Sequence, residues 1–332
     1  MKPSHVKELI DLLDKSKEIV IVTHWSPDGD AMGSSLGLYN YLIQKQHHVT
    51  VITPNDYPAF LFWMQGNDKV IDFSATPNPA KKAVAKADLI FCLDFNALGR
   101  IDSLGEEVGK SKAKKCIIDH HPQPEDFADY MLHTVKTSST CELVYDFIVL
   151  MGDQKLINKD VSNCLYAGIM TDTGSFRFPS TSSKTHRVIA DLIEAGAEHS
   201  EIHNRIYDNN TEDKLRLLGY SFVEKLVVLK QYGTAFFSLS AAELSRFNYR
   251  KGDTEGLVNY ALSIEGIYFG VFIVERDGKV KLSFRSRGNF DVNKFARANF
   301  SGGGHANAAG GVSELSLDET IAKLVSLLPG KE

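Results

Sequence analysis

The first 190 or so residues alternate short apolar runs with longer segments in which apolar residues recur at helical spacing. Residues 18–23 and 49–53 have the composition of β-strands, and residues 31–46 between them show the pattern of a helix. Repeated strand, helix, strand units favour a doubly wound, mostly parallel sheet, so the sequence predicts an α/β fold here. Further strands are expected at 88–93 and 114–118, and further helices at 4–15, 79–86, 140–151 and 160–170.

The pattern changes after about residue 190. Residues 198–220 are polar with helical spacing and a break at 208–211, and β-type runs then dominate. Because 332 residues exceed the usual size of a single hydrophobic core, we expect two domains. We assign residues 1–195 to the α/β domain, 196–222 to a helical linker and 223–332 to a smaller α+β domain. Its expected strands are 225–230, 234–239, 264–275 and 279–284, and its expected helices are 255–262, 292–298 and 317–328.

Composition narrows the function. With 43% hydrophobic and 24% charged residues, the chain has the make-up of a soluble globular protein. A formal charge of −5 argues against a surface that neutralises the phosphates of a long duplex, so any nucleic-acid substrate is expected to be short. The first residues lack the apolar core of a signal peptide, and no stretch approaches the roughly 18 apolar residues of a membrane span. For these two reasons we expect a cytoplasmic protein with no membrane partner. The four cysteines are scattered along the chain, so we expect their thiols to be reduced.

Metal-ligand side chains gather where the expected strands of the first domain end. One string, from His24 to Asp30, follows strand 18–23, and another, from Asp119 to His121, follows strand 114–118. The carboxyl ends of parallel strands meet at one edge of a sheet, where open α/β sheets bind ligands, so these side chains are expected to converge. The candidates are His24, Asp28, Asp30, Asp94, Asp119, His120, His121 and Asp172.

The residue types indicate a divalent metal. Carboxylates and imidazoles without thiolates suit manganese, magnesium or iron rather than structural zinc. Asp28 and Asp30 are separated by one glycine, so their side chains can diverge towards two ions, and the number of candidates fits two ions better than one. Two ions about 3.5–4 Å apart can activate a water and stabilise both oxygens of a displacement at phosphorus. Taken singly, each aspartate is more often a turn, cap or solvated loop residue.

Together these strings resemble the four motifs of the DHH phosphoesterase superfamily. The matching segments are His24-Trp25-Ser26-Pro27-Asp28-Gly29-Asp30-Ala31-Met32-Gly33-Ser34, then Asp94, then Asp119-His120-His121, then Thr171-Asp172-Thr173-Gly174. The resemblance implies one manganese ion on His24, Asp28 and Asp94 and a second on Asp30, Asp94, His120 and Asp172, so that Asp94 bridges; magnesium or another divalent metal is the alternative. It also implies that Asp119 orients a neighbouring group and that His121 contacts the phosphate or the leaving oxygen.

A second motif lies in the C-terminal domain. Consecutive glycines let backbone N–H groups approach an anion, and a helix starting at Ala306 would add a favourable dipole. The run Gly302-Gly303-Gly304-His305 resembles the hallmark of the superfamily's DHH-associated domain, although Ser301 replaces a glycine that family members often carry. The resemblance implies that Gly303, Gly304 and His305 bind substrate in a cleft between the two domains.

Arginines and hydroxyls supply further candidates for phosphate binding. Arg285 and Arg287 end an expected strand, and their guanidinium forks match phosphate geometry. The family pattern similarly uses an arginine here, with Arg285 favoured, and a surface salt bridge is the alternative for either. Ser139 and Thr140 begin an expected helix and can present hydroxyl and N–H groups to a phosphate, or cap the helix instead.

The resemblance implies a hydrolase. Two-domain chains of this kind resemble the bifunctional group that hydrolyses short RNA oligonucleotides, including dinucleotides, and dephosphorylates 3′-phosphoadenosine 5′-phosphate by metal-assisted in-line attack on phosphorus; either cleavage polarity is open. The alternatives are a phosphoanhydride hydrolase acting on pyrophosphate or polyphosphate, a cyclic or linear dinucleotide phosphodiesterase, and a nucleotide-binding regulator with a decayed site. The glycine-histidine motif counts against the first alternative, and the complete ligand set counts against the last. A homodimer is a further expectation.

Overall fold

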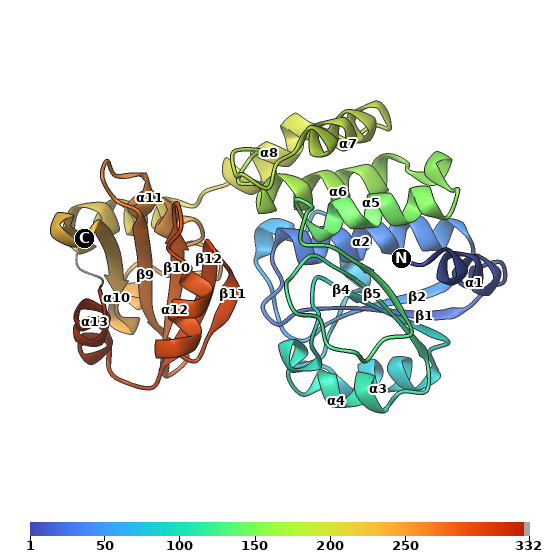
Figure 1. Ribbon diagram of the computed structural model, residues 1–332, viewed down its shortest axis with the longest axis horizontal. Coiled ribbons are helices and arrows are strands. Elements are labelled where there is room, and N and C mark those ends of the chain that lie inside the picture. The colour runs from blue at the N-terminus through green and yellow to red at the C-terminus, as the bar shows by residue number, and fades with distance from the viewer. Residues whose placement is uncertain (329–332) are drawn as a thin grey trace. The chain divides into compact units, whose positions relative to one another are not determined.

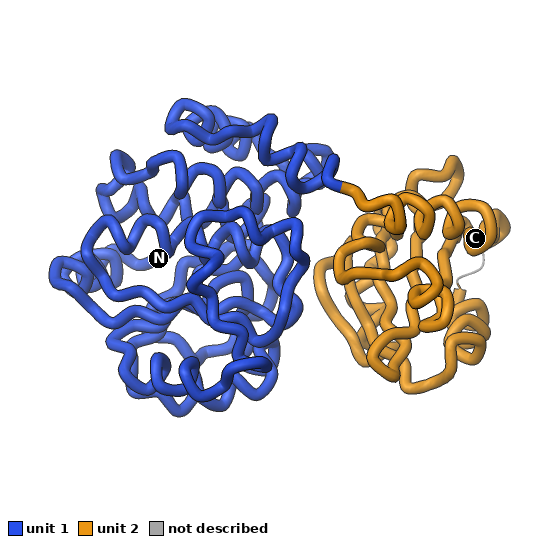
Figure 2. The backbone as a smooth tube through the Cα atoms, turned by 180° about the vertical axis from the view of Figure 1, so that it is seen from behind, with its two compact units in different colours: residues 1–209 blue, residues 210–332 orange. Residues whose placement is uncertain are grey.

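The computed structural model describes residues 1–328, which fall into two compact units, residues 1–209 and residue 210 onward (Figures 1 and 2). The division lies inside the segment 196–222 that the sequence assigns to a linker. Helix α8 (His199–Tyr207) belongs to the first unit, because Ile202 and Ile206 are buried in its core. Helix α9 (Glu212–Tyr220) belongs to the second unit through the buried Leu217. The two helices of this segment are therefore divided between the units.

The first unit is built on a six-stranded parallel sheet with the strand order β3-β2-β1-β4-β5-β6. This confirms the predicted doubly wound α/β fold. The two short strands at β3 and β6 were not predicted, because two and four residues are too few to show a periodic pattern. The strands are β1 (Glu18–Thr23), β2 (His48–Thr53), β3 (Ile71–Asp72), β4 (Leu89–Leu93), β5 (Lys114–Asp119) and β6 (Tyr130–His133).

Helices cover both faces of this sheet (Figure 1). Helices α2 and α5 pack on one face, and α3 and α4 pack on the other. Helix α6 packs on α2 and α5, and α7 and α8 pack in turn on α6. The helices of this unit besides α8 are α1 (Pro3–Leu13), α2 (Gly29–Gln44), α3 (Pro77–Lys86), α4 (Leu104–Lys110), α5 (Thr140–Leu150), α6 (Lys159–Asp172) and α7 (Ser183–Glu194). Short 3-10 turns lie at η1 (Ala59–Leu61), η2 (Asn67–Lys69), η3 (Leu98–Ile101) and η4 (Gln154–Leu156).

Glycines allow α2 and α6 to approach closely. Gly33 and Gly37 lie on the face of α2 that meets α6, and a Cβ at Gly33 would come within 2.6 Å of the carbonyl oxygen of Cys164. A Cβ at Gly168 on α6 would overlap the sulfur of Cys141 and lie 3.1 Å from Oδ1 of Asp30. The close approach matters for function, because Asp30 lies in the first turn of α2 and Asp172 ends α6.

Replacing Gly168 by alanine is therefore expected to destabilise the first unit by about 1–3 kcal/mol, because the added methyl group overpacks a buried contact. The measurement is the shift of the first unit's unfolding transition in urea. Gly219 on α9 is the matched control, since a Cβ there meets nothing within 4 Å. Gly219→Ala should leave the free energy of unfolding of its own unit, the second, unchanged or raise it by about 0.5–1 kcal/mol through helix propensity. Equal stabilities of the two variants would contradict the prediction.

The second unit also contains a six-stranded sheet, with the order β11-β12-β10-β9-β8-β7. Strands β8 and β9 run parallel and the other neighbours run antiparallel. Helices α12 and α13 bury apolar residues on one side of the sheet, and α9, α10 and α11 do so on the other. The strands are β7 (Leu226–Leu229), β8 (Thr234–Leu239), β9 (Phe269–Arg276), β10 (Lys279–Ser286), β11 (Gly303–His305) and β12 (Ala308–Ser313). The remaining elements are η5 (Ser221–Lys225), η6 (Lys230–Tyr232), α10 (Ala241–Arg246), α11 (Leu257–Ser263), α12 (Val292–Asn299) and α13 (Leu317–Ser326).

The glycine-rich segment corrects one expectation. No helix starts at Ala306; the segment forms the hairpin of β11 and β12 instead. Gly302 packs directly against the carbonyl oxygen of Gly310, and Gly304 has φ 152°, a backbone conformation that favours glycine. The small residues thus permit a tight hairpin rather than a helix N-terminus. Within residues 1–328, no helix is both long enough and apolar enough to span a bilayer.

Candidate metal centre

The order of the strands brings the predicted ligands of the first unit together. Strands β1 and β4 are neighbours, and Thr23 pairs with Leu93, so the next residues, His24 and Asp94, emerge side by side. This is the point where the strand order reverses, and open α/β sheets bind ligands at such points. Asp94 has φ 62°, a strained backbone conformation of the kind found at functional sites.

A first cluster consists of His24, Asp28 and Asp94, whose ligand atoms lie within 4.8 Å of one another. Nδ1 of His24 donates a hydrogen bond to the carbonyl oxygen of Trp25 over 2.8 Å. Its Nε2 therefore faces the carboxylates, 3.3 Å from Oδ2 of Asp94 and 3.9 Å from Oδ1 of Asp28. A backbone carbonyl that fixes one ring nitrogen and directs the other inward is the usual arrangement around a metal-binding histidine.

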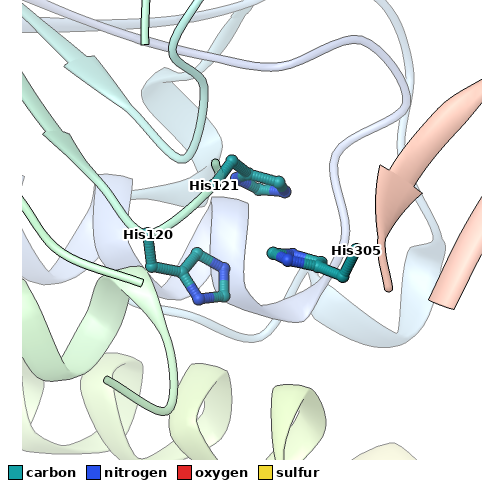
Figure 3. Close-up of side chains that lie close together, drawn as sticks. All are labelled: His120, His121 and His305. Carbon is teal, nitrogen blue, oxygen red and sulfur yellow. The ribbon is translucent and has the colours of Figure 1, made fainter. Parts of the chain in front are cut away.

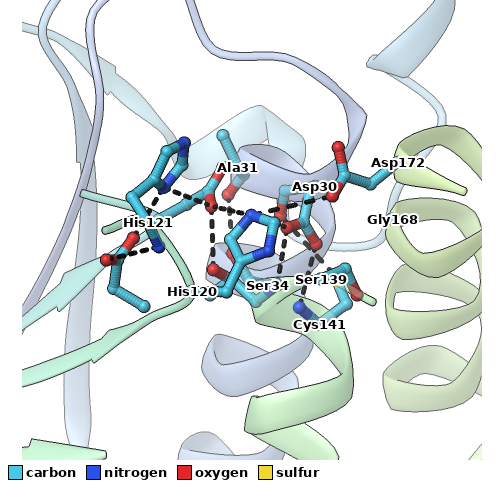
Figure 4. Close-up of polar contacts among 12 residues, drawn as sticks. Asp30, Ala31, Ser34, His120, His121, Ser139, Cys141, Gly168 and Asp172 are labelled. Carbon is cyan, nitrogen blue, oxygen red and sulfur yellow. Dashed lines mark hydrogen bonds and ion pairs between the residues drawn. The ribbon is translucent and has the colours of Figure 1, made fainter. Parts of the chain in front are cut away.

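A second cluster consists of Asp30, His120 and Asp172 (Figure 4). Nε2 of His120 lies 3.9 Å from Oδ2 of Asp30 and 3.6 Å from Oδ2 of Asp172. The same nitrogen lies 3.5 Å from Oδ1 of Asp94. The two oxygens of Asp94 thus face different histidines, Oδ2 towards the first cluster and Oδ1 towards the second.

The N-terminus of α5 holds the carboxylate of Asp30. The backbone N–H groups of Thr140 and Cys141 donate to its two oxygens over 2.6 and 2.9 Å, and the Thr140 hydroxyl donates to Oδ1 of Asp94 over 2.8 Å. Ser139 caps the helix by accepting a hydrogen bond from the N–H of Glu142. Ser139 is therefore a helix cap, which is one of the two roles that the sequence left open for it. The N–H and the hydroxyl of Thr140, which were expected to bind a phosphate, are instead hydrogen-bonded to the carboxylates of Asp30 and Asp94. The helix dipole favours the negative charge placed there.

Electrostatics favour a cation at this edge of the sheet. Burial, together with the charges of Asp94, Asp172 and Asp28, raises the pKa of Asp30 well above its usual value. Burial also opposes ionisation of Asp94, but its contacts with His24 and the neighbouring histidines hold its pKa below the usual range. For His24, burial acts to lower the pKa, and hydrogen bonds with Asp28 and Asp94 nevertheless raise it to about 10. Crowded buried carboxylates of this kind are stabilised by a bound positive charge. The donor set of oxygen and imidazole atoms therefore fits divalent metal ions.

Asp119 fixes the side chain and the backbone of His121. The N–H of His121 donates to Oδ2 of the fully buried Asp119 over 2.9 Å, and Nδ1 lies 2.8 Å from Oδ1. The ring of His121 meets that of His120 edge to face, with ring centres 4.8 Å apart (Figure 3). Because Nδ1 donates to the carboxylate, Nε2 is the nitrogen through which His121 can exchange a proton with a substrate.

Two residues beside His121 were missed by sequence reasoning. Nε2 of His133 donates to the carbonyl oxygen of His121 over 2.6 Å, and Nδ2 of Asn96 donates to the same oxygen over 3.2 Å. His133 ends β6 and pairs in register with Asp119 on β5. The short strand β6 has no periodic pattern that would have placed His133 at this edge. Asn96 could have been found, because it lies two residues after Asp94, which was predicted at the same edge.

His133→Ala is expected to lower kcat about tenfold with KM nearly unchanged, because residues that orient the groups bound at a metal site typically contribute 10–100-fold to activity. The measurement is steady-state hydrolysis of a dinucleotide with manganese. His133→Gln keeps an N–H donor that can reach the same carbonyl, so it should recover most of the loss. Wild-type kcat for His133→Ala would show that the second donor, Asn96, suffices.

The second unit brings two of its predicted residues into one row. Arg285 on β10 pairs with Ala308 on β12, and Ala308 pairs with His305 on β11. Residues in one row of a sheet point to the same face, and neighbouring strands lie about 4.8 Å apart. Arg285 and His305 therefore lie on one face with only the small Ala308 between them. Arg287 follows the end of β10, and Gly303 and Gly304 lie in β11.

A parallel sheet whose carboxyl edge carries two adjoining carboxylate–imidazole clusters is an arrangement suited to hydrolases that act with divalent metal ions. Comparison with known proteins makes this specific. Residues 18–169 match the DHH family, N-terminal domain, and residues 233–328 match the DHHA1 domain. With these matches and the relatives described next, which are 30% and 31% identical over most of both chains, the chain belongs to the DHH family and is a phosphoesterase.

Several relatives extend over nearly the whole chain. This chain is 30% identical over 325 residues to the bifunctional oligoribonuclease and PAP phosphatase NrnA of Bacillus subtilis, and the matched region covers 96% of each chain. It is 31% identical over 310 residues to the NrnA of Thermus thermophilus, covering 92% of this chain and 88% of the relative. A crystal structure of an exopolyphosphatase-related protein from Bacteroides fragilis is 40% identical, with a TM-score of 0.94 and coverage of 98% and 96%.

Proposed function

We propose that this chain hydrolyses short RNA oligonucleotides and 3′-phosphoadenosine 5′-phosphate with two divalent metal ions, and that manganese is the preferred metal. The observation that carries the proposal is the position of Asp94, whose two carboxylate oxygens face the two clusters. A shared carboxylate is the arrangement expected of a two-metal site. The names of the NrnA relatives support the choice of substrates.

The ligand assignment follows the two clusters. His24, Asp28 and Asp94 would hold one ion, and Asp30, Asp94, His120 and Asp172 would hold the other. When bound, such ions lower the pKa of a water and neutralise charge at phosphorus. The protein's own contribution is to fix the ligands: Trp25 orients His24, and the N-terminus of α5 orients Asp30.

His121 is proposed to act as the general acid. Asp119 holds its Nδ1 proton and its backbone N–H, so the ring presents Nε2 to the leaving oxygen. Proton donation to an alkoxide leaving group typically contributes about 10²–10⁴-fold to a rate. No covalent intermediate is required, because water supplies the nucleophile.

The second unit is proposed to bind the substrate. Arg285 and His305 share a face of the sheet and offer a guanidinium and an imidazole to a phosphate or a base. Arg287, Gly303 and Gly304 are the other proposed contacts, with Gly304 contacting the substrate through its Cα, because its N–H donates to Asn293. Ser139 and Thr140 are assigned instead to the support of α5 and of the two carboxylates, on the hydrogen bonds described above.

A second candidate is hydrolysis of phosphoanhydrides. It is favoured by the likeness to the exopolyphosphatase-related protein of Bacteroides fragilis, which is 40% identical to this chain. The metal centre alone does not separate the two activities, because both place a phosphorus atom between the same ligands. The choice depends on which leaving group the second unit accepts.

One panel of substrates tests the proposal. The purified full chain with manganese would be assayed against pApA, 3′-phosphoadenosine 5′-phosphate, a cyclic dinucleotide, pyrophosphate and polyphosphate. We expect kcat/KM for the first two to exceed that for the others by at least about tenfold, which corresponds to about 1.4 kcal/mol of transition-state stabilisation. Preferential hydrolysis of pyrophosphate or polyphosphate would overturn the proposal. Binding of manganese without any hydrolysis would favour a nucleotide-binding regulator.

A further inference from the structure

The glycine-histidine hairpin of the second unit uses one of its backbone donors internally. The N–H of Gly304 donates to Oδ1 of Asn293 on α12 over 3.0 Å. The N–H of Val292, the first residue of α12, donates to the carbonyl oxygen of Ala306 over 2.8 Å. The hairpin is thus tied to α12, which lies beside β11 and β12 (Figure 1). The N–H of Gly304 is therefore not the donor that an anion would meet at this loop.

The same amide oxygen holds an arginine. Nε of Arg297 donates to Oδ1 of Asn293 over 3.1 Å, one helical turn away on α12. A Cβ at Gly303 would lie 3.5 Å from this Nε and 3.7 Å from Nη2, so the guanidinium stands directly beside the hairpin. Asn293 therefore fixes the loop and the arginine in one arrangement, and the missing side chain of Gly303 leaves the guanidinium uncovered.

The charge of Arg297 is exposed and has no acidic partner within residues 1–328. The neighbouring carboxylate of Asp291 caps α12 and pairs with Lys294 over 3.6 Å. With Nε directed to Asn293, Nη1 and Nη2 remain as a fork of donors, the geometry that binds phosphate oxygens in pairs. A held arginine without a carboxylate, beside a glycine loop, is suited to a phosphate monoester.

We propose that Arg297 binds the second, non-reacting phosphate of the substrate, which is the 5′-phosphate of 3′-phosphoadenosine 5′-phosphate or of a 5′-phosphorylated dinucleotide. This inference rests on the proposed function. The proposed metal ions would neutralise the reacting phosphate, so a second phosphate needs a cation of its own. Arg297 supplies that cation and selects substrates that carry a terminal phosphate.

Two matched pairs of substrates test this role. In 3′-phosphoadenosine 5′-phosphate against 3′-AMP, and in pApA against ApA, only the first member carries the second phosphate. With the full chain and manganese, Arg297→Ala is expected to raise KM for the first member of each pair about tenfold and to leave KM for the second member unchanged. Lys294→Ala removes an exposed cation from the same helix. In this variant, the ratio of KM values between the two members of each pair should equal that of the wild type.

The possible failures are distinguishable. If wild-type protein hydrolyses these substrates and Arg297→Ala changes neither KM, or changes both members of a pair equally, the role of Arg297 is refuted and the proposed function stands. If wild-type protein hydrolyses none of the four, the proposed function fails and the inference fails with it. An unfolding temperature equal to that of wild type would show that the exposed Arg297 is not needed for folding.

Discussion

Replacing Asp94 by asparagine is expected to lower kcat by at least about 10³-fold, which corresponds to about 4 kcal/mol of transition-state stabilisation. Asparagine keeps the shape of the side chain, tolerates the φ of 62° and can still accept the hydroxyl of Thr140. It loses the negative charge that both clusters share. The measurement is kcat for pApA with manganese, together with the rise in unfolding temperature that manganese produces.

The matched control for this change is Asp126→Asn, which neutralises an exposed carboxylate in the same unit. We expect this variant to keep wild-type activity, because its proposed metal ligands are unchanged. Manganese should raise its unfolding temperature as much as that of the wild type, because a ligand that binds the folded state stabilises it. Asp94→Asn should show little of that rise while remaining folded in EDTA. More than a tenth of wild-type kcat in Asp94→Asn would refute the bridging role.

His121→Gln is expected to lower kcat for pApA by about 10²–10³-fold, because glutamine cannot donate a proton to the leaving oxygen. A substrate with a p-nitrophenolate leaving group needs no such proton, so its kcat should fall less than about fivefold. The ratio of the two losses is the measured quantity. It separates proton donation from binding, which would affect both substrates alike.

Asp119→Asn is the companion variant. It removes the charge that holds Nδ1 of His121 but keeps a side chain of the same size at a fully buried position. A loss of about 10–100-fold for pApA, again smaller for the activated substrate, is expected of a residue that orients the acid. Equal losses for both substrates in His121→Gln would assign His121 to phosphate binding instead.

Much of the first unit could be predicted from sequence, for a local reason. Strand 18–23 and the helix expected at 31–46, which spans Gly29–Gln44 in the structure, are recognisable by their own periodicity, and the α/β class follows from the alternation of such segments. The strand end at Asp119 and the helix end at Asp172 could be located to within two residues in the same way, since the expected ends were residues 118 and 170. The hairpin at Gly303 could not, because glycines are compatible with a helix N-terminus and with a tight turn.

The sequence by itself determined which metal-binding residue types stand at the strand ends, because strand and helix patterns are local and side-chain chemistry is read directly. Only the tertiary structure decided how they are used. Thr140 bonds Asp30 across 110 residues of sequence, and His133 bonds the backbone of His121 across a sheet edge. The tertiary structure also directs the two oxygens of Asp94 to different histidines and places Arg297 beside the hairpin. Hydrogen bonds depend on distance and direction between groups far apart in the chain, which no local pattern specifies.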